Sequence, residues 1–248
     1  MQDPSETFYR ARTNTISMLI DRGYKDQSTG RTEDLQNRYI SYDEFLQLFQ
    51  VGGIAMDLAG IVTPEGLPVY VKFVCGRGGQ DRNCEEITTS SLYSKDGSGI
   101  FSDIAHDAFQ KEHIKHDPEK TDLRKFLQEV KVIVVFTASR NNKNKFKTDV
   151  EKSFTMPDYP NIELWPVHRL QCNYANHILV KPHRILSEIE KQAVLHRFNL
   201  NVSMMPEMCI DDPLNRWYNG HPGDVYKVSR GTAPHYVIVV SRKMPLSG

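Results

Sequence analysis

The residues that could bind a catalytic metal ion form only loose groups in this sequence. Asp211-Asp212 is an acidic pair of the kind that holds magnesium. Proline follows it directly, which favours Asp212 as a helix cap with Pro213 at the first helical position. A second group matches no zinc spacing and consists of His106, His113, His116, Cys75 and Cys84. We therefore predict no catalytic residue, no metal site and no cofactor.

Two further patterns concern phosphate chemistry, and both are incomplete. Pro157-Asp158 followed by Glu163 approaches the arrangement of metal-dependent nucleases, but Trp165 stands where that chemistry places a lysine. The lysine would stabilise negative charge on the attacked phosphate. Residues 76–79 (Gly-Arg-Gly-Gly) follow a predicted strand, yet no Gly-Lys-Ser or Gly-Lys-Thr comes after them. The first pattern leaves a degenerate nuclease as an alternative function, and the second favours a flexible loop.

One local basic run could contact nucleic acid. It follows the predicted strand at residues 131–137, at the edge of the sheet where α/β proteins usually bind ligands. Its lysines and amides could contact phosphate without reading sequence, and so few charges predict a weak contact. On spacing alone, a solvated helix start is the simpler interpretation. The residues of this DNA-proximal group are Arg140, Asn141, Asn142, Lys143, Lys145 and Lys147.

Composition excludes several classes of protein. Lysine plus arginine (31) balances aspartate plus glutamate (31), so any contact with nucleic acid or membrane must come from a local patch. The four cysteines include no CxxC pair, which favours a reducing compartment. The first residues are polar and acidic, unlike a signal peptide, and the apolar runs are too short to span a bilayer. We expect an intracellular protein without membrane contact.

The N-terminal part alternates helical and strand-like segments. Apolar periodicity predicts a helix over residues 7–22, closed by Gly23 in a left-handed conformation. Ser41 with Glu44 is a capping box that begins a second helix. Strands are predicted at residues 69–74, 131–137 and 162–167, and further helices at residues 101–114, 122–129 and 145–154.

The C-terminal part has a different pattern. Ser187 and Glu190 form another capping box, which begins a helix that runs to Phe198. Two strands are predicted at residues 225–229 and 236–241. The residues expected to face inward on the helix are Ile189, Ala193, Val194 and Phe198.

These elements predict two domains with a boundary near residue 170. Residues 1–170 should form an α/β domain with a small, mainly parallel sheet, because β-α-β-α-β alternation favours parallel strands. Residues 76–99 are polar and rich in glycine and serine, so we predict a loop insertion there. Residues 171–248 should form a compact α+β domain.

The C-terminal part carries a family resemblance. Residues 177–183 (His-Ile-Leu-Val-Lys-Pro-His) resemble the H-x-L-V-P-x-H segment of the RNA polymerase subunit that eukaryotic nuclear enzymes share and that archaea possess in a shorter form. That segment opens the assembly domain of the family. The predicted helix follows, and residues 205–208, 212–225 and 227–230 then resemble the family's next segments in the same order. Several fragments at near-constant spacing form a far stronger signal than any one of them.

The N-terminal part resembles the same family more loosely. Residues 11–14 (Ala-Arg-Thr-Asn) and 18–24 (Met-Leu-Ile-Asp-Arg-Gly-Tyr) are similar to the family's opening helix. The β-α-β-α-β series resembles the jaw domain of the eukaryotic subunit, which the archaeal form lacks. Residues 76–99 fall outside the resemblance, and residues 242–248 run past the family's usual terminal strand.

The resemblance implies a non-catalytic subunit of a DNA-directed RNA polymerase in the nucleus. Its C-terminal domain would dock on the largest subunit, beside neighbouring small subunits, and its jaw would lie along downstream duplex DNA. Trp217 and Tyr218 would anchor a partner if the fold leaves them exposed. The residues predicted to act in docking or folding are His177, Pro182, His183, Pro206, Asp212, Pro213, Trp217, Tyr218, Gly223 and Arg230.

Two departures mark the chain as a divergent member of that family. Glu207 stands where the family customarily has a basic residue, and residues 230–232 shorten a family segment. They indicate a divergent lineage or a paralogue dedicated to one polymerase. Whether that enzyme is polymerase I, II, III or a viral relative stays open. A free-standing adaptor that carries the assembly domain is a further alternative.

Overall fold

A computed structural model describes residues 3–51, 56–74, 129–136, 161–231 and 233–241. The chain divides into two compact units, Met1–Cys172 and Asn173–Gly248. Several predictions lie outside the described residues: the 76–99 insertion, the DNA-proximal run, the histidine and cysteine group, the helices at 101–114 and 145–154, and nearly all of the helix at 122–129. In the described part of the chain, no helix is long and apolar enough to cross a membrane.

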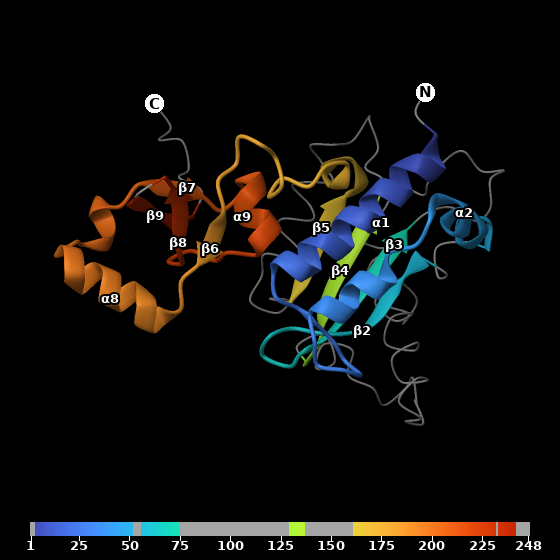
Figure 1. Ribbon diagram of the computed structural model, residues 1–248, viewed down its shortest axis with the longest axis horizontal. Helices are drawn as coiled ribbons and strands as arrows, with labels where there is room; N and C mark the ends of the chain where they lie inside the picture. The colour runs from blue at the N-terminus through green and yellow to red at the C-terminus, as the bar shows by residue number, and fades with distance from the viewer. Residues whose placement is uncertain (1–2, 52–55, 75–128, 137–160, 232, 242–248) are drawn as a thin grey trace, which may run out of the picture. The chain divides into compact units, whose positions relative to one another are not determined.

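The N-terminal unit contains a sheet of five strands in the order β1-β2-β3-β4-β5 (Figure 1). The pairs β3/β4 and β4/β5 are parallel, and the pairs β1/β2 and β2/β3 are antiparallel. The three predicted strands are confirmed, but the sheet is mixed rather than mainly parallel. The strands are β1 (Lys25–Asp26), β2 (Leu58–Val62), β3 (Pro68–Val74), β4 (Lys131–Phe136) and β5 (Ile162–Pro166).

The sequence pattern does not reveal β1 and β2, for physical reasons. Strand β1 has two residues, too few for any periodicity. Strand β2 contains Gly60 at φ +69°, and its register against β3 shifts between Leu58 and Ile61. A bulge of this kind breaks the alternation on which strand prediction depends.

Helix α1 (Pro4–Asp21) lies across the sheet, with η1 (Glu33–Arg38) and α2 (Tyr42–Val51) beside it (Figure 1). Gly23 has φ +72°, and the Tyr24 N–H donates to the carbonyl of Leu19 (3.0 Å), so the predicted left-handed helix end is confirmed. The capping box at Ser41 is also confirmed, because the Ser41 N–H donates to the Glu44 carboxylate at 2.8 Å.

The C-terminal unit has a sheet of four strands in the order β6-β8-β9-β7. Strands β6 (His183–Ile185), β8 (Val225–Arg230) and β9 (Ala233–Val240) are antiparallel neighbours, and β7 (Glu207–Cys209) runs parallel to β9. The two long strands agree with the prediction. The edge strands have three residues each, which is too short for a sequence pattern to reveal.

Helices cover the two faces of this sheet. Helix α8 (Glu188–Phe198) packs through Val194 and Leu195 on a cluster that includes Val225. Helix α9 (Pro213–Tyr218) contributes Tyr218 to the cluster on the opposite face. Two short 3₁₀ helices complete the described elements, η2 (Val167–Leu170) in the N-terminal unit and η3 (Val202–Met204) after α8.

The capping box of α8 is confirmed, but much of its predicted inward face is wrong. The Ser187 hydroxyl accepts from the Glu190 N–H while the Glu190 carboxylate accepts from the Ser187 N–H. Ile189 is nevertheless 84% exposed and Phe198 49% exposed, and Ala193 is exposed as well. The helix has no fully buried residue, because the small sheet needs only one narrow stripe of it.

Candidate docking surface

Two neighbouring aliphatic residues project from the turn that precedes β6. Ile178 is 88% exposed and Leu179 is 80% exposed. The turn is held from within, since the Val180 N–H donates to the His177 carbonyl (2.8 Å) and the Leu179 N–H to Nδ1 of His177 (3.2 Å). We call Ile178 and Leu179 the turn surface. Both side chains leave most of their apolar surface in contact with solvent.

The segment after the turn ties it to the sheet. The Pro182 carbonyl accepts from the Ser229 N–H at 3.0 Å. His183 pairs with Val228 across the strands, and its ring lies edge-on to Tyr226 with the centroids 6.0 Å apart. Three predicted docking residues therefore lie in one segment: His177 and Pro182 are exposed and His183 is half-buried.

Helix α9 and its N-cap residue account for four more of the predicted residues, and one of them corrects the prediction. The Asp212 carboxylate accepts from the Leu214 N–H at 2.8 Å with Pro213 at the start of the helix, so the cap is confirmed. Trp217 is fully buried and packs edge-on against Tyr174 at 6.0 Å. It belongs to the core of the unit and is not an exposed partner anchor. Tyr218 is half-buried in the sheet cluster.

The core beside α9 contains a polar group that the sequence does not reveal. The Asn215 amide donates to the carbonyls of Ile210 (3.1 Å) and Gly220 (3.0 Å), and its oxygen accepts from the Tyr226 hydroxyl (3.0 Å). Asn215 and Tyr226 are both buried. These bonds fix the turn after α9 to the sheet, because buried amide groups without partners would be costly.

The remaining predicted residues organise the backbone. Gly223 has φ +95°, and its N–H donates to the Val239 carbonyl at 2.9 Å. The exposed Pro206 offers its carbonyl to the Ile238 N–H at 2.9 Å, just before β7. Arg230 ends β8 opposite Ala233. All three positions have a structural role in the sheet.

A second apolar surface lies at the end of α8. Phe198, Val202 and Met204 are 49%, 42% and 65% exposed, and we call these three residues the α8–η3 surface. The sequence pattern does not single it out, because periodicity cannot tell a buried apolar residue from an exposed one. Six of the seven exposed large apolar residues in the described part of the chain lie in the C-terminal unit.

The N-terminal unit contains a buried charge cluster on β5. Its centre is Glu163, one of the acidic residues of the nuclease-like pattern. Arg22 donates to both oxygens of the Glu163 carboxylate at 2.9 Å. Lys131 lies 2.7 Å from the same carboxylate, and Trp165 Nε1 donates to it at 3.0 Å. Burial alone would raise the pKa of Glu163, but the two cations outweigh it and hold that pKa well below its usual range. A carboxylate so fully engaged has no free oxygen for a catalytic metal.

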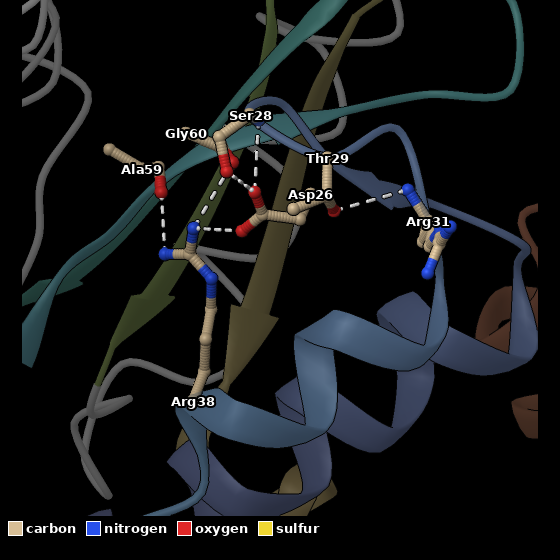
Figure 2. A network of polar contacts seen from close by, with 7 residues as sticks. All are labelled: Asp26, Ser28, Thr29, Arg31, Arg38, Ala59 and Gly60. Atoms are coloured by element: carbon tan, nitrogen blue, oxygen red, sulfur yellow. Dashed lines mark hydrogen bonds and ion pairs between the residues drawn. The ribbon is translucent and has the colours of Figure 1, made fainter.

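A second polar network supports the turn after β1 (Figure 2). Arg38 donates to the Asp26 carboxylate (2.7 Å) and to the carbonyls of Ala59 (2.6 Å) and Gly60 (3.1 Å). The hydroxyl of Ser28 and the guanidinium of Arg38 lower the pKa of Asp26 to about 2. The network joins β1, η1 and β2, and of the Arg38 guanidinium only the buried Nε has no hydrogen-bond partner. Among the described residues, no three acidic, histidine or cysteine side chains gather as a metal site.

Comparison with known proteins gives a family match in the C-terminal unit. The family described as RNA polymerase Rpb5, C-terminal domain, matches residues 172–242. The match spans the turn surface, α8, α9 and all four strands of the sheet.

The chain is also similar in sequence to individual polymerase subunits. DNA-directed RNA polymerase subunit Rpo5 of Pyrococcus horikoshii is 34% identical over 75 residues, which cover 28% of this chain and 92% of that subunit. DNA-directed RNA polymerases IV and V subunit 5B of Arabidopsis thaliana is 31% identical over 68 residues, 27% of this chain and 31% of that subunit. DNA-directed RNA polymerases I, II, and III subunit rpabc1 of Dictyostelium discoideum is 28% identical over 118 residues, 47% of this chain and 58% of that subunit.

Proposed function

Because this chain belongs to the Rpb5 family of DNA-directed RNA polymerase subunits, we propose that it is a non-catalytic subunit that docks on the largest subunit of its polymerase through the turn surface. Catalysis would belong to the other subunits of the complex. The contact would include neighbouring small subunits, and the predicted docking residues on either side of the turn would position it.

The observation that carries this proposal is the exposure of Ile178 and Leu179 on an ordered turn, at 88% and 80%. Covering an aliphatic side chain is worth about 1.5–3 kcal/mol. The internal hydrogen bonds of His177 already fix the turn, so a partner would lose little of that energy in ordering it. Two such side chains are a suitable centre for a subunit interface.

The size of the archaeal match supports docking through one small unit. The Pyrococcus horikoshii subunit is matched over 92% of its length by only 28% of this chain. That subunit is named as part of an RNA polymerase. A stretch about as long as the C-terminal unit therefore makes up nearly the whole of a polymerase subunit in that organism.

We further propose that the N-terminal unit is a jaw that lies beside downstream duplex DNA. The Dictyostelium discoideum match is longer than the whole C-terminal unit, so it includes part of the N-terminal unit. That relative is named as a subunit of polymerases I, II and III, which supports a eukaryotic-type subunit in the nucleus. The DNA contact, at residues 140–147, would be weak and independent of sequence because it neutralises few phosphates.

Affinity purification of the tagged full chain from its own cells tests the docking proposal. We expect the largest polymerase subunit to co-purify, and Ile178→Glu combined with Leu179→Glu to reduce its recovery at least about tenfold. Ile189→Glu is the matched control, because Ile189 is an equally exposed isoleucine of the same unit and should leave recovery unchanged. Equal recovery of the largest subunit with the parent chain, the double variant and the control variant would refute the role of the turn surface.

The same purification tests the two alternatives. A chain that elutes without any polymerase subunit would instead support a free-standing adaptor. A nuclease is disfavoured, because Arg22 and Lys131 neutralise the Glu163 carboxylate on which its metal chemistry would depend.

A further inference from the structure

The α8–η3 surface lies outside the docking contact proposed above. Its three apolar side chains come from the last turn of α8 and from η3, whereas the turn surface precedes β6. Helix α8 covers one face of the sheet but buries none of its own residues fully. Leu195 and Leu200, which lie close to this surface in sequence, are only partly buried where they pack on the core. The end of α8 is therefore an apolar face that the C-terminal unit itself does not cover.

The surface is already ordered. Helix α8 ends at Asn199 with φ 48°, and the Leu200 N–H donates to the Leu195 carbonyl at 3.0 Å. The Met204 N–H donates to the Asn201 carbonyl at 2.9 Å, which closes the turn of η3. The ring of Phe198 also packs on Tyr236, with centroids 6.0 Å apart. A partner would therefore meet a preformed face.

A basic side chain lies at the edge of this surface. Residues 192–206 contain His196 and Arg197 but no aspartate or glutamate. The Arg197 guanidinium lies 5.5 Å from the centre of the Phe198 ring, at the rim of the apolar side chains. Glu207, the next acidic residue along the chain, already takes part in an interaction within the protein.

The acidic residues at the other end of α8 are also paired. Glu188 lies 3.1 Å from the ammonium group of Lys191, and Glu190 accepts two hydrogen bonds from Arg184. The negative charge of the helix is thus confined to its first turns and largely balanced there. Arg197 is therefore the charged side chain that an acidic partner would meet beside Phe198.

We propose that the α8–η3 surface binds an acidic amphipathic polypeptide segment of a regulatory protein, in which bulky apolar side chains alternate with aspartate and glutamate. The apolar side chains would cover Phe198, Val202 and Met204, and the carboxylates would pair with Arg197 at the rim. A flexible Met204 suits such a partner, because methionine adapts to irregular apolar shapes. Duplex DNA fits less well, since it would use the arginine but leave the apolar residues uncovered.

Fluorescence anisotropy with the full chain tests this proposal. The probe is a fluorescein-labelled synthetic peptide of about fifteen residues that alternates Leu and Phe with Asp and Glu. We expect a Kd on the order of 10–100 µM, which rises with added salt because the charged pairs are exposed. Replacement of all its acidic residues by lysine should abolish binding.

Variants of the chain locate the contact. Met204→Glu and Val202→Glu should each weaken binding at least about tenfold, because each removes apolar contact area and adds a repelling charge. Both side chains are exposed, so circular dichroism should show an unchanged fold. Ile189→Glu is the control, since Ile189 is exposed at the start of α8, outside the α8–η3 surface, and should leave peptide affinity unchanged.

Three results would overturn the proposal. They are equal affinity for the lysine peptide, no loss of affinity in the Met204→Glu and Val202→Glu variants, and tighter binding of a labelled DNA duplex at the same surface. The docking proposal is judged separately, by recovery of the largest polymerase subunit with the turn-surface variants. Either proposal can therefore fail without the other.

Discussion

Replacing Glu163 by glutamine should destabilise the N-terminal unit strongly. The carboxylate holds Arg22 through two hydrogen bonds and Lys131 at 2.7 Å, and the side chains of these cations are only 2% and 7% exposed. A neutral glutamine would leave two buried positive charges without a counter-charge, and Trp165 would lose its hydrogen-bond acceptor. Removing one partner from a buried ion pair costs about 3–5 kcal/mol. We expect Glu163→Gln to cost that much.

Urea denaturation of the full chain measures this cost. The chain has two tryptophans, Trp165 in the N-terminal unit and Trp217 in the C-terminal unit, and both are buried. A Trp217→Phe background therefore lets fluorescence follow the N-terminal unit alone. For a urea m-value of about 2 kcal/mol per molar, the unfolding midpoint should fall by about 2 M.

A matched control separates burial from the loss of charge itself. Glu6 pairs with Arg10 on the surface of the same unit, with side chains 41% and 49% exposed. Glu6→Gln should cost no more than about 0.5 kcal/mol, as exposed pairs do. If Glu163→Gln costs as little as Glu6→Gln, the argument that these buried cations depend on the carboxylate is wrong.

The same cluster predicts how stability depends on pH. The pKa of Glu163 in the folded protein lies well below its ordinary value of 4.5, because Arg22 and Lys131 outweigh the effect of burial. Its contribution is therefore fully present above pH 4.5 and is lost as pH falls toward the lower, folded pKa. The difference in unfolding free energy between the parent chain and Glu163→Gln should shrink between about pH 4.5 and pH 3. A difference independent of pH over this range would contradict the prediction.

Two further predictions concern the C-terminal unit. Gly220→Ala should cost about 3 kcal/mol, because the added carbon would lie 2.2 Å from the Asn215 oxygen and 2.6 Å from the Tyr226 hydroxyl. Urea unfolding, monitored by the fluorescence of Trp217, measures that loss. An unchanged midpoint would show that the Asn215 and Tyr226 side chains can move away from the added carbon. Asp212→Ala should cost only about 1 kcal/mol, the usual value of a helix cap. If Asp212→Ala lowers the free energy of unfolding as much as Gly220→Ala does, the prediction for the helix cap is wrong.

The sequence predicts local features of this fold well and distant pairings poorly. The capping boxes at Ser41 and Ser187, the cap at Asp212 and the helix end at Gly23 can all be predicted, because each depends on residues within one turn. The short strands cannot, because their hydrogen bonds come from strands elsewhere in the chain. Glu163 shows the same limit, since Arg22 lies 141 residues away in sequence.

The predicted docking residues show what a family pattern cannot separate. Asp212, Trp217 and Gly223 all match the family pattern, yet each has a structural role. Asp212 caps α9, Trp217 is buried in the core and Gly223 adopts the positive φ of a turn. A residue that maintains a fold and one that contacts a partner are both restricted in type, so a pattern alone cannot distinguish them. Exposure does so, and it points to Ile178 and Leu179, which the pattern contains but does not single out.

The error on α8 has a physical cause that bears on its function. Apolar residues on a helix predict an inward face only if the rest of the fold is large enough to cover them. Here the sheet has four strands, two of them three residues long, and it accepts Val194 and Leu195 but leaves Ile189 and Phe198 outside. Exposed apolar side chains lower the solubility of a lone chain and are stabilising only when covered. Phe198, which Val202 and Met204 follow in sequence, therefore favours a partner at the end of α8, and the peptide assay tests which kind of partner binds there.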